Sequence, residues 1–185
     1  MAFEAEKLTI DGLQVINPFY MEDDRGSFTK TYEKDVYAAL GIEGYLAETF
    51  ETMSKKDVIR GMHFQTFEPQ GKLVRAVFGE IMDVAVDLRV GSPTFGKWES
   101  VILSEANHKM FWIPAGFAHG FVVKSDKALV SYSCIGKYHG EADTGIVWND
   151  ADLAIDWGID MPIVSDKDSK LMTFREFADK FQGLQ

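Results

Sequence analysis

The sequence predicts a mainly β protein built as an antiparallel sandwich or barrel, and three observations support this. Short segments rich in Val, Ile, Phe, Tyr and Trp follow one another, separated by Gly, Pro, Ser, Asp and Asn. Turn signals recur roughly every 8 to 12 residues, which is typical of antiparallel sheets. Residues 81–88 alternate in polarity, so Asp83 and Asp87 share one face of a predicted strand.

Nine segments are predicted strands, at residues 8–16, 58–59, 73–77, 81–88, 98–103, 109–113, 117–123, 128–135 and 145–148. Two helices complete the expected fold. The first covers residues 33–40, in the N-terminal half, and stops before Gly41, a suitable C-terminal cap. The second covers about residues 173–182, where Thr173 and Glu176 form a capping box and a stripe of phenylalanines packs on the body.

Length and composition narrow the class of protein. A chain of 185 residues is compatible with a single domain over residues 1–185. Residues 1–7 lack the features of a secretory signal, Cys134 is the single cysteine, and no apolar run approaches the roughly 20 residues of a membrane span. We therefore expect a cytoplasmic protein that does not span a membrane. A net charge of -10 argues against nucleic-acid binding.

Basic and imidazole side chains stand among the apolar strands. They occur in Arg60–Gln65, in Gln70–Arg75 and in Ile113–Phe121. Strands that present such groups from an apolar face indicate a barrel or sandwich with a polar pocket inside. Such a pocket suits proton chemistry on an anionic small molecule.

A metal site is the first alternative for these histidines. The usual ligand pattern would place a second His two residues after His63, but Gln65 stands there. Glu68 and then Lys72 follow, and His119 is the one well-placed imidazole partner. Two imidazoles beside an ammonium group make a poor cation site. We predict that no metal is bound.

Without a metal, His63 is a candidate general base, because an imidazole accepts a proton near neutral pH and a carboxylate partner can fix its tautomer. Lys72 on a neighbouring strand could stabilise an oxyanion formed when a C–H bond beside a carbonyl is broken. Tyr132 could return the proton as an acid. Composition leaves the alternatives open, since a strand Tyr is commonly a core or rim residue and an isolated His a satisfied polar group.

Longer motifs add to this interpretation. They are Arg25–Phe28, Arg60–Gln65, Gly71–Arg75, Asp83–Arg89, Ser92–Trp98, Ile113–Phe121, Tyr138, Trp148–Asp150 and Ile155–Trp157. In this order and with nearly unbroken spacing, from about Leu8 to Asp168, they strongly resemble the dTDP-4-dehydrorhamnose 3,5-epimerase family.

The resemblance implies a cupin or jelly-roll antiparallel β-barrel that works as a homodimer without metal or organic cofactor. The implied substrate is a nucleotide-linked 4-keto-6-deoxyhexose, used for deoxysugar and polysaccharide precursors. Its 4-ketone acidifies the hydrogens on C3 and C5, so that both centres can invert through an enolate.

The resemblance also implies roles for matched positions. His63 is the base paired with Asp168, Lys72 stabilises the enolate oxygen, and Tyr132 reprotonates the opposite face. The implied substrate-binding residues are Arg25 and Arg60 for the diphosphate, Tyr138 for the nucleobase, and His119, Asp143 and Lys167 for further contacts. Asp143 replaces an expected Glu.

Three positions depart from the family pattern. Lys30 stands where a Glu is usual, and Glu48 and Phe50 replace amide side chains. We expect these residues to border the nucleoside and sugar, although Lys30 could be solvated and Phe50 a core residue. The alternatives are a 3- or 5-epimerase of another nucleotide keto-sugar, a keto-sugar 3,4-isomerase, and a non-catalytic sugar-nucleotide-binding module.

Overall fold

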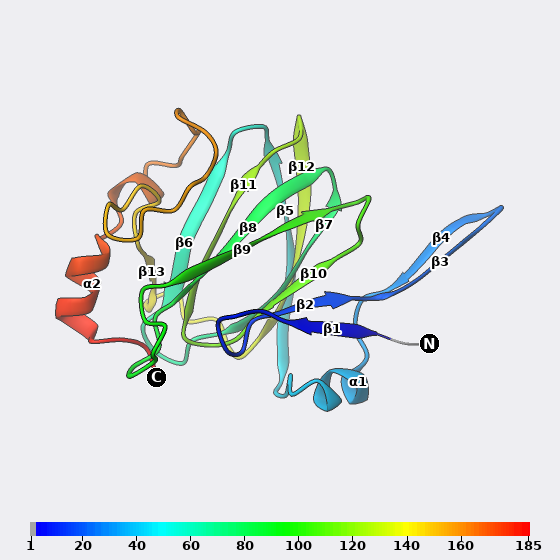
Figure 1. Ribbon diagram of the computed structural model, residues 1–185, viewed down its shortest axis with the longest axis horizontal. Helices are drawn as coiled ribbons and strands as arrows, with labels where there is room; N and C mark the ends of the chain where they lie inside the picture. Colours follow the sequence, from blue (N-terminus) through cyan, green and yellow to red (C-terminus); the bar gives the residue numbers. More distant parts are fainter. Residues whose placement is uncertain (1–2) are drawn as a thin grey trace.

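Two antiparallel sheets face each other in the computed structural model, which describes residues 3–185 (Figure 1). The six-stranded sheet has the order β1 (Glu4–Lys7), β2 (Gln14–Asn17), β10 (Met110–Ile113), β7 (Gly71–Phe78), β12 (Lys127–Ile135) and β5 (Leu46–Lys55). The five-stranded sheet has the order β13 (Asp143–Gly145), β6 (Ile59–Gln65), β11 (Phe117–Val123), β8 (Glu80–Asp87) and β9 (Trp98–Ser104). The mainly β, jelly-roll fold is confirmed, as two separate sheets and not as a closed barrel.

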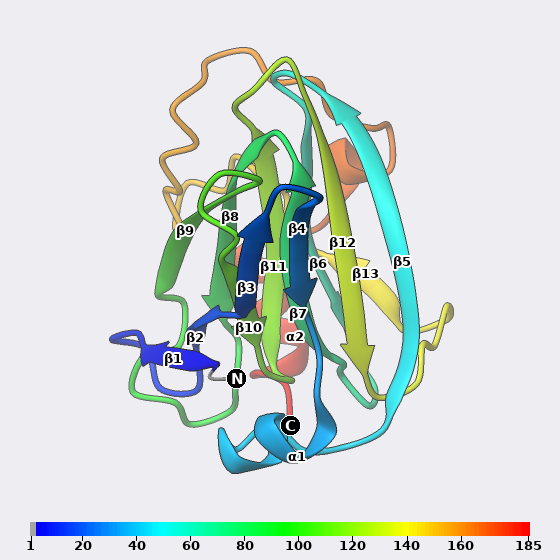
Figure 2. The same ribbon diagram turned by 90° about the vertical axis from the view of Figure 1, so that its right-hand side faces the viewer.

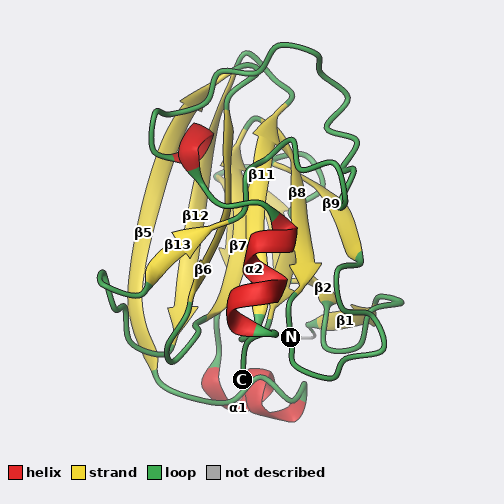
Figure 3. Ribbon diagram, turned by 90° about the vertical axis from the view of Figure 1, so that its left-hand side faces the viewer, coloured by secondary structure: helices red, strands yellow, loops and turns green. Residues whose placement is uncertain are grey.

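The remaining elements surround these sheets. Strands β3 (Phe19–Asp23) and β4 (Gly26–Lys30) form a hairpin that projects away from the body (Figures 1 and 2). The short helix α1 (Lys34–Ala39) precedes β5, and a single 3-10 turn occupies Asp168–Lys170. Helix α2 (Phe174–Phe181) lies against the five-stranded sheet (Figure 3). None of the helices within residues 3–185 has the length and apolar character to span a bilayer.

Apolar side chains cover both faces of the five-stranded sheet. On the inner face, Phe121 of β11 packs with Val74 of the opposite sheet. On the outer face, Val122 belongs to a cluster that includes Trp157 and Phe177 of α2. Strand β11 is therefore buried along its whole length, which explains its nearly continuous apolar sequence.

Both predicted helix ends are confirmed. The Thr173 side chain accepts a hydrogen bond from the Glu176 amide at 3.2 Å, and the Glu176 carboxylate accepts one from the Thr173 amide at 2.7 Å. Gly41 follows the C-cap of α1 with a φ of +79°, a conformation that favours glycine.

Three predicted strands were wrong in their bounds. The segment predicted at residues 58–59 reaches only the start of β6, which continues to Gln65. Residues 8–16 do not form one strand, because the chain turns through Gly12, whose φ is +94°, and β1 then pairs back onto β2. The strand predicted at residues 145–148 is instead Asp143–Gly145. Beyond it Ile146 still exchanges backbone hydrogen bonds with Met62 of β6 and also bridges to Met172, and the Val147 amide then donates to the Met172 carbonyl.

The sequence pattern also missed four strands, β1, β3, β4 and β5. Their exposed positions carry many polar residues, so no clear apolar face marks them. Strand β5 is an edge strand, and only Ser54 in it is fully buried. Edge strands of this kind resemble loops in composition.

Candidate active site

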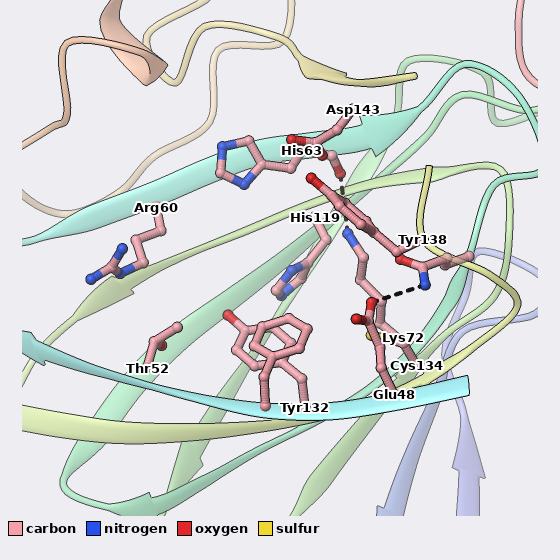
Figure 4. Close-up of a pocket in the computed structure, with 12 residues that line it drawn as sticks. Glu48, Thr52, Arg60, His63, Lys72, His119, Tyr132, Cys134, Tyr138 and Asp143 are labelled. Atoms are coloured by element: carbon pink, nitrogen blue, oxygen red, sulfur yellow. Dashed lines mark hydrogen bonds between the residues drawn. The ribbon is translucent and has the colours of Figure 1, made fainter. Parts of the chain in front are cut away.

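A cavity of about 330 Å³ lies between the two sheets (Figure 4). Strands β5, β7 and β12 of one sheet and β6, β11 and β13 of the other supply most of its walls. The lining side chains are Glu48, Phe50, Thr52, Arg60, His63, Gln70, Lys72, His119, Tyr132, Cys134, Tyr138 and Asp143. The sequence prediction of a polar pocket inside a β fold is therefore confirmed.

His63 on β6 is paired with Asp168 from the 3-10 turn. Its Nε2 donates to Asp168 Oδ1 at 2.8 Å, and Asp168 Oδ2 accepts from the Gly61 amide at 3.3 Å. Burial raises the pKa of Asp168, but the bonds from His63, Gly61 and Ser165 outweigh it and leave that pKa below its usual value. Asp168 is thus ionised at neutral pH, and it fixes the tautomer in which His63 Nδ1 carries a free lone pair.

A second imidazole–carboxylate pair lies deeper in the same cavity. His119 on β11 and Asp83 on β8 are both buried, with His119 Nε2 and Asp83 Oδ1 2.7 Å apart. Burial lowers the pKa of His119 and raises that of Asp83, and their mutual attraction opposes both shifts. His119 on β11 and His63 on β6 are register partners, so both imidazoles belong to the five-stranded sheet.

Lys72 reaches across the cavity from the six-stranded sheet. Its Nζ donates a long hydrogen bond of 3.5 Å to the His63 carbonyl oxygen (Figure 4). Burial lowers the pKa of Lys72, and nearby carboxylates, Asp143 among them, oppose this shift. The ammonium group therefore lies beside the backbone of His63, the residue on the opposite sheet that carries the imidazole base.

Tyr132 on β12 belongs to the sheet that faces His63. Its ring stacks on Phe50 with centroids 4.6 Å apart and an interplanar angle of 15°, and meets His119 edge-on at 5.7 Å. Burial raises the pKa of Tyr132 well above its usual value, and the Asp83 charge adds to the effect. The phenol is accordingly in its acid form at neutral pH.

Polar and aromatic groups mark the rim of the cavity. Arg60 Nε donates to Ser54 Oγ at 2.9 Å, which leaves the terminal guanidinium nitrogens for other partners. Lys167 Nζ donates to Asp143 Oδ2 at 2.6 Å, and this bond raises the pKa of Lys167. Tyr138 is half exposed in the segment between β12 and β13. Cations and an aromatic face at one opening suit an anionic ligand that carries a flat ring.

Two other chemistries find little support in this cavity. Burial raises the pKa of Cys134 to about 11, so its thiol is protonated at neutral pH and a weak nucleophile. Among residues 3–185, no three His, Cys, Asp or Glu side chains converge as metal ligands. Acid–base groups therefore dominate the chemistry that the cavity offers.

Comparison with known proteins identifies the family. The family model described as dTDP-4-dehydrorhamnose 3,5-epimerase matches residues 7–176. Enzymes of this name from Methanothermobacter thermautotrophicus and Pseudomonas aeruginosa are 45% and 43% identical to the chain, covering 94% and 96% of it and 96% and 99% of themselves. The chain belongs to the dTDP-4-dehydrorhamnose 3,5-epimerase family. The resemblance stated from the motifs is thus confirmed, and with it the assignment as an epimerase, an enzyme of the isomerase class.

Structural similarity agrees with this family. The crystal structure of dTDP-6-deoxy-D-glucose-3,5-epimerase from Legionella pneumophila, in complex with dTDP-4-keto-L-rhamnose, superposes with a TM-score of 0.91 at 41% identity. The match covers 94% of each chain. The two proteins therefore share their fold over nearly the whole of both chains.

Most residues singled out from the sequence meet in the epimerase cavity. His63, Lys72, Tyr132, Arg60, His119, Tyr138, Asp143, Glu48 and Phe50 line it. Asp168 and Lys167 join it indirectly, through their bonds to His63 and Asp143. The substrate roles that the family resemblance implies for these residues remain predictions.

Arg25 and Lys30 lie outside the cavity of their own chain. Arg25 is at the turn of the β3–β4 hairpin, with its side chain 87% exposed and paired with Asp23. Lys30 ends β4 and forms an ion pair with Glu33. Within the single chain, the ion-pair partners of Arg25 and Lys30 are Asp23 and Glu33, which do not line the cavity. The predicted binding role of Arg25 and specificity role of Lys30 therefore stay predictions.

Sequence reasoning missed four residues of the site. Thr52, Gln70 and Cys134 line the cavity, and Asp83 pairs with His119. Side chains two residues apart on a strand face the same way, and this spacing could have indicated three of them. Thr52, Gln70 and Cys134 stand two residues from Phe50, Lys72 and Tyr132, respectively. Asp83 was noted for its alternation, but nothing in the sequence indicated its imidazole partner.

Proposed function

We propose that this protein inverts C3 and C5 of dTDP-4-dehydro-6-deoxyglucose to give dTDP-4-dehydrorhamnose, without a metal or organic cofactor. The observation that carries the proposal is the placement of base and acid on different sheets. His63 enters the cavity from the five-stranded sheet and Tyr132 from the six-stranded sheet. A sugar bound between them meets a base on one face and an acid on the other.

In the first step His63 Nδ1 removes the proton from carbon beside the 4-ketone. The C–H electrons form the enolate, and its negative charge settles on the ketone oxygen. The imidazolium formed on His63 is stabilised by the ionised Asp168 partner. The Lys72 ammonium, close to His63, stabilises the enolate oxygen.

In the second step the Tyr132 hydroxyl delivers its proton to the opposite face of the same carbon. The carbon centre is then inverted, and the phenolate and imidazolium exchange protons with water to restore the enzyme. The high pKa of buried Tyr132 keeps the proton on the phenol until the strongly basic enolate forms.

Substrate binding follows from the cavity rim. Arg60 binds the diphosphate, because its terminal nitrogens are free for paired phosphate oxygens. Tyr138 stacks on the nucleobase with its exposed ring. His119, held by Asp83, and the Asp143–Lys167 pair contact the sugar nucleotide, and Glu48 and Phe50 tune which hexose or base is accepted.

The working form is proposed to be a cytoplasmic homodimer with one domain per chain. The β3–β4 hairpin supports the dimer, because it projects from the body with Met21 46% and Phe28 53% exposed (Figure 1). A second copy would cover these apolar side chains. It would also bring Arg25 and Lys30, at the turn and end of the hairpin, toward a neighbouring cavity.

Incubation with dTDP-4-keto-6-deoxyglucose in deuterium oxide, followed by proton NMR, tests the proposal. Deuterium at both C3 and C5 with formation of the inverted product is expected. Deuterium at one carbon alone would show that the protein is a single-centre epimerase. Migration of the carbonyl group to C3 would show that it is a keto-sugar isomerase. Binding without any label would leave a non-catalytic sugar-nucleotide-binding module or an enzyme for another nucleotide.

A further inference from the structure

Phe50 covers one side of the Tyr132 ring. The two residues are register partners on β5 and β12, and their rings are nearly parallel at 4.6 Å. Phe50 is 42% exposed whereas Tyr132 is 6% exposed. Because β5 is the edge strand of its sheet, Phe50 stands between the phenol and the solvent at that edge.

A second aromatic contact, with His119, also holds the Tyr132 ring. His119 meets it edge-on at 5.7 Å with an interplanar angle of 77°, and His119 is itself fixed by its bond to buried Asp83. The Tyr132 phenol is thus in contact with an aromatic ring on the edge strand β5 and with the His119 imidazole of the facing sheet. Of these two supports, only Phe50 lies on an edge strand.

We infer that Phe50 is a positioning residue, which holds the Tyr132 phenol in line for proton delivery to the face opposite His63. The inference rests on the proposed function and deepens it. Proton delivery demands tight alignment, and a displacement of about 1 Å at a reacting group can cost on the order of 100-fold in rate. A smaller side chain at position 50 would open one face of the phenol and let it turn away from the sugar.

Two simpler roles for Phe50 make different predictions. If Phe50 only filled space in the fold, its loss would slow proton removal and proton return together. If it only touched the substrate, its loss would raise KM and leave the balance of the two steps unchanged. A positioning role affects the return step alone, since Phe50 stacks on the acid Tyr132, whereas the base His63 is held by Asp168.

The first test compares Phe50→Leu, Phe50→Tyr and the control Phe78→Leu in deuterium oxide. Phe78 on β7 is also 42% exposed but lies outside the cavity. In Phe50→Leu, deuterium incorporation with retained configuration should stay near the wild-type rate while inversion falls roughly 10- to 100-fold. Phe50→Tyr should restore inversion, and Phe78→Leu should match the wild type. An unchanged ratio of exchange to inversion in Phe50→Leu would overturn the inference.

The second test needs no substrate. Protein labelled with ¹³Cζ-tyrosine gives a Tyr132 signal that is identified by its loss in Tyr132→Phe. This signal should be a single sharp line in the wild type and in Phe78→Leu, and should shift or broaden in Phe50→Leu. An identical line in all three would overturn the inference. Should the wild type show no exchange, the proposed function fails, and this spectrum still decides whether Phe50 holds Tyr132.

Discussion

At the scale of single residues, the site depends on which groups are charged before substrate arrives. Asp168 is ionised because three hydrogen bonds outweigh its burial, whereas Tyr132 stays protonated because burial and a nearby carboxylate both oppose its ionisation. One group therefore supports an imidazolium and the other retains a proton to give. The pKa of Asp168 is thus lowered and that of Tyr132 is raised, so that Asp168 supports the base His63 while Tyr132 serves as the acid.

The base is tested by His63→Ala. Deuterium incorporation into the keto-sugar should fall by about 10²- to 10⁴-fold, because the change removes the imidazole that accepts the proton. His108→Ala serves as the control, since His108 stacks on Tyr20 and does not line the cavity. Exchange in His63→Ala at the rate of the control would remove His63 from its role.

The oxyanion partner is tested by Lys72→Ala and by the longer, uncharged Lys72→Met. Both should lower kcat by roughly 10²- to 10³-fold with a smaller change in KM, because the charge on oxygen develops mainly in the transition state. Lys127→Ala, which removes an ammonium that lies over Phe78, should leave both constants near wild type. A rise in KM with unchanged kcat would make Lys72 a simple substrate clamp.

At the scale of elements, the β3–β4 hairpin is the least explained part of a single chain. Among residues 3–185 its strands pair only with each other; it projects away from both sheets and carries Arg25 at its turn (Figure 1). A charged turn on a hairpin that exposes Met21 and Phe28 fits an arm that reaches a second molecule. If Arg25 binds diphosphate, it must do so in a cavity other than its own.

Mixed dimers test this arrangement. Arg25→Ala and His63→Ala chains, each impaired alone, should regain activity when combined, because one site of the mixed dimer then has an intact His63 and an intact Arg25 from the other chain. About half of the wild-type activity per mixed dimer is the upper limit, since one of two sites is restored. Mixing without recovery, in chains shown to exchange by sedimentation, would place Arg25 in its own chain's function or in none.

The motifs allowed the centre of the site to be predicted from the sequence better than its surroundings. Tyr132 stands in a strand predicted from its pattern, whereas His63 and Lys72 lie just beyond the strands predicted at residues 58–59 and 73–77 and were identified by their chemistry and motifs. The partnership of His119 with Asp83 could not be predicted in this way, because it joins strands 36 residues apart in the chain. Such contacts depend on the order of strands in the sheet, which local patterns do not encode.

Strand prediction failed for a related reason. β5 was missed because its exposed side chains hide the alternation of Glu48, Phe50 and Thr52 toward the cavity. The turn at Gly12 was missed because Leu8 and Leu13 sit on both sides of it and continue the apolar pattern. Apolar periodicity predicts buried strands well, and edge strands and tight turns poorly.

At the scale of the whole molecule, stability at acid pH depends on the carboxylate of Asp87, which ends β8 and holds the loop that follows. Asp87 is fully buried, accepts hydrogen bonds from Arg89, Ser92 and Thr94, and faces no solvent. Burial raises its pKa, but these bonds outweigh it and lower the pKa to about 2. Because the folded pKa is depressed, the stabilisation is present above the unfolded pKa and is lost as the pH falls toward the folded one.

Acid unfolding tests this anchor. The free energy of unfolding should decline between about pH 4 and pH 2, with Asp87 contributing about 2 kcal/mol of the loss. Asp87→Asn should lower stability at neutral pH and flatten this part of the curve. The control Asp152→Asn, which breaks an exposed pair with Arg175, should leave both nearly unchanged. A curve for Asp87→Asn parallel to that of the wild type would contradict the assignment.

The central proposal is that the base and the acid act on the two faces of a keto-sugar from opposite sheets. Tyr132→Phe tests it most directly, because this change removes the acid and leaves the base. Proton NMR in deuterium oxide should show C–H exchange at C3 and C5 continuing with retained configuration, while inversion falls by about 10²- to 10⁴-fold. Inversion at the full wild-type rate in Tyr132→Phe would contradict the account, because the proton would then reach the far face of the sugar without the phenol.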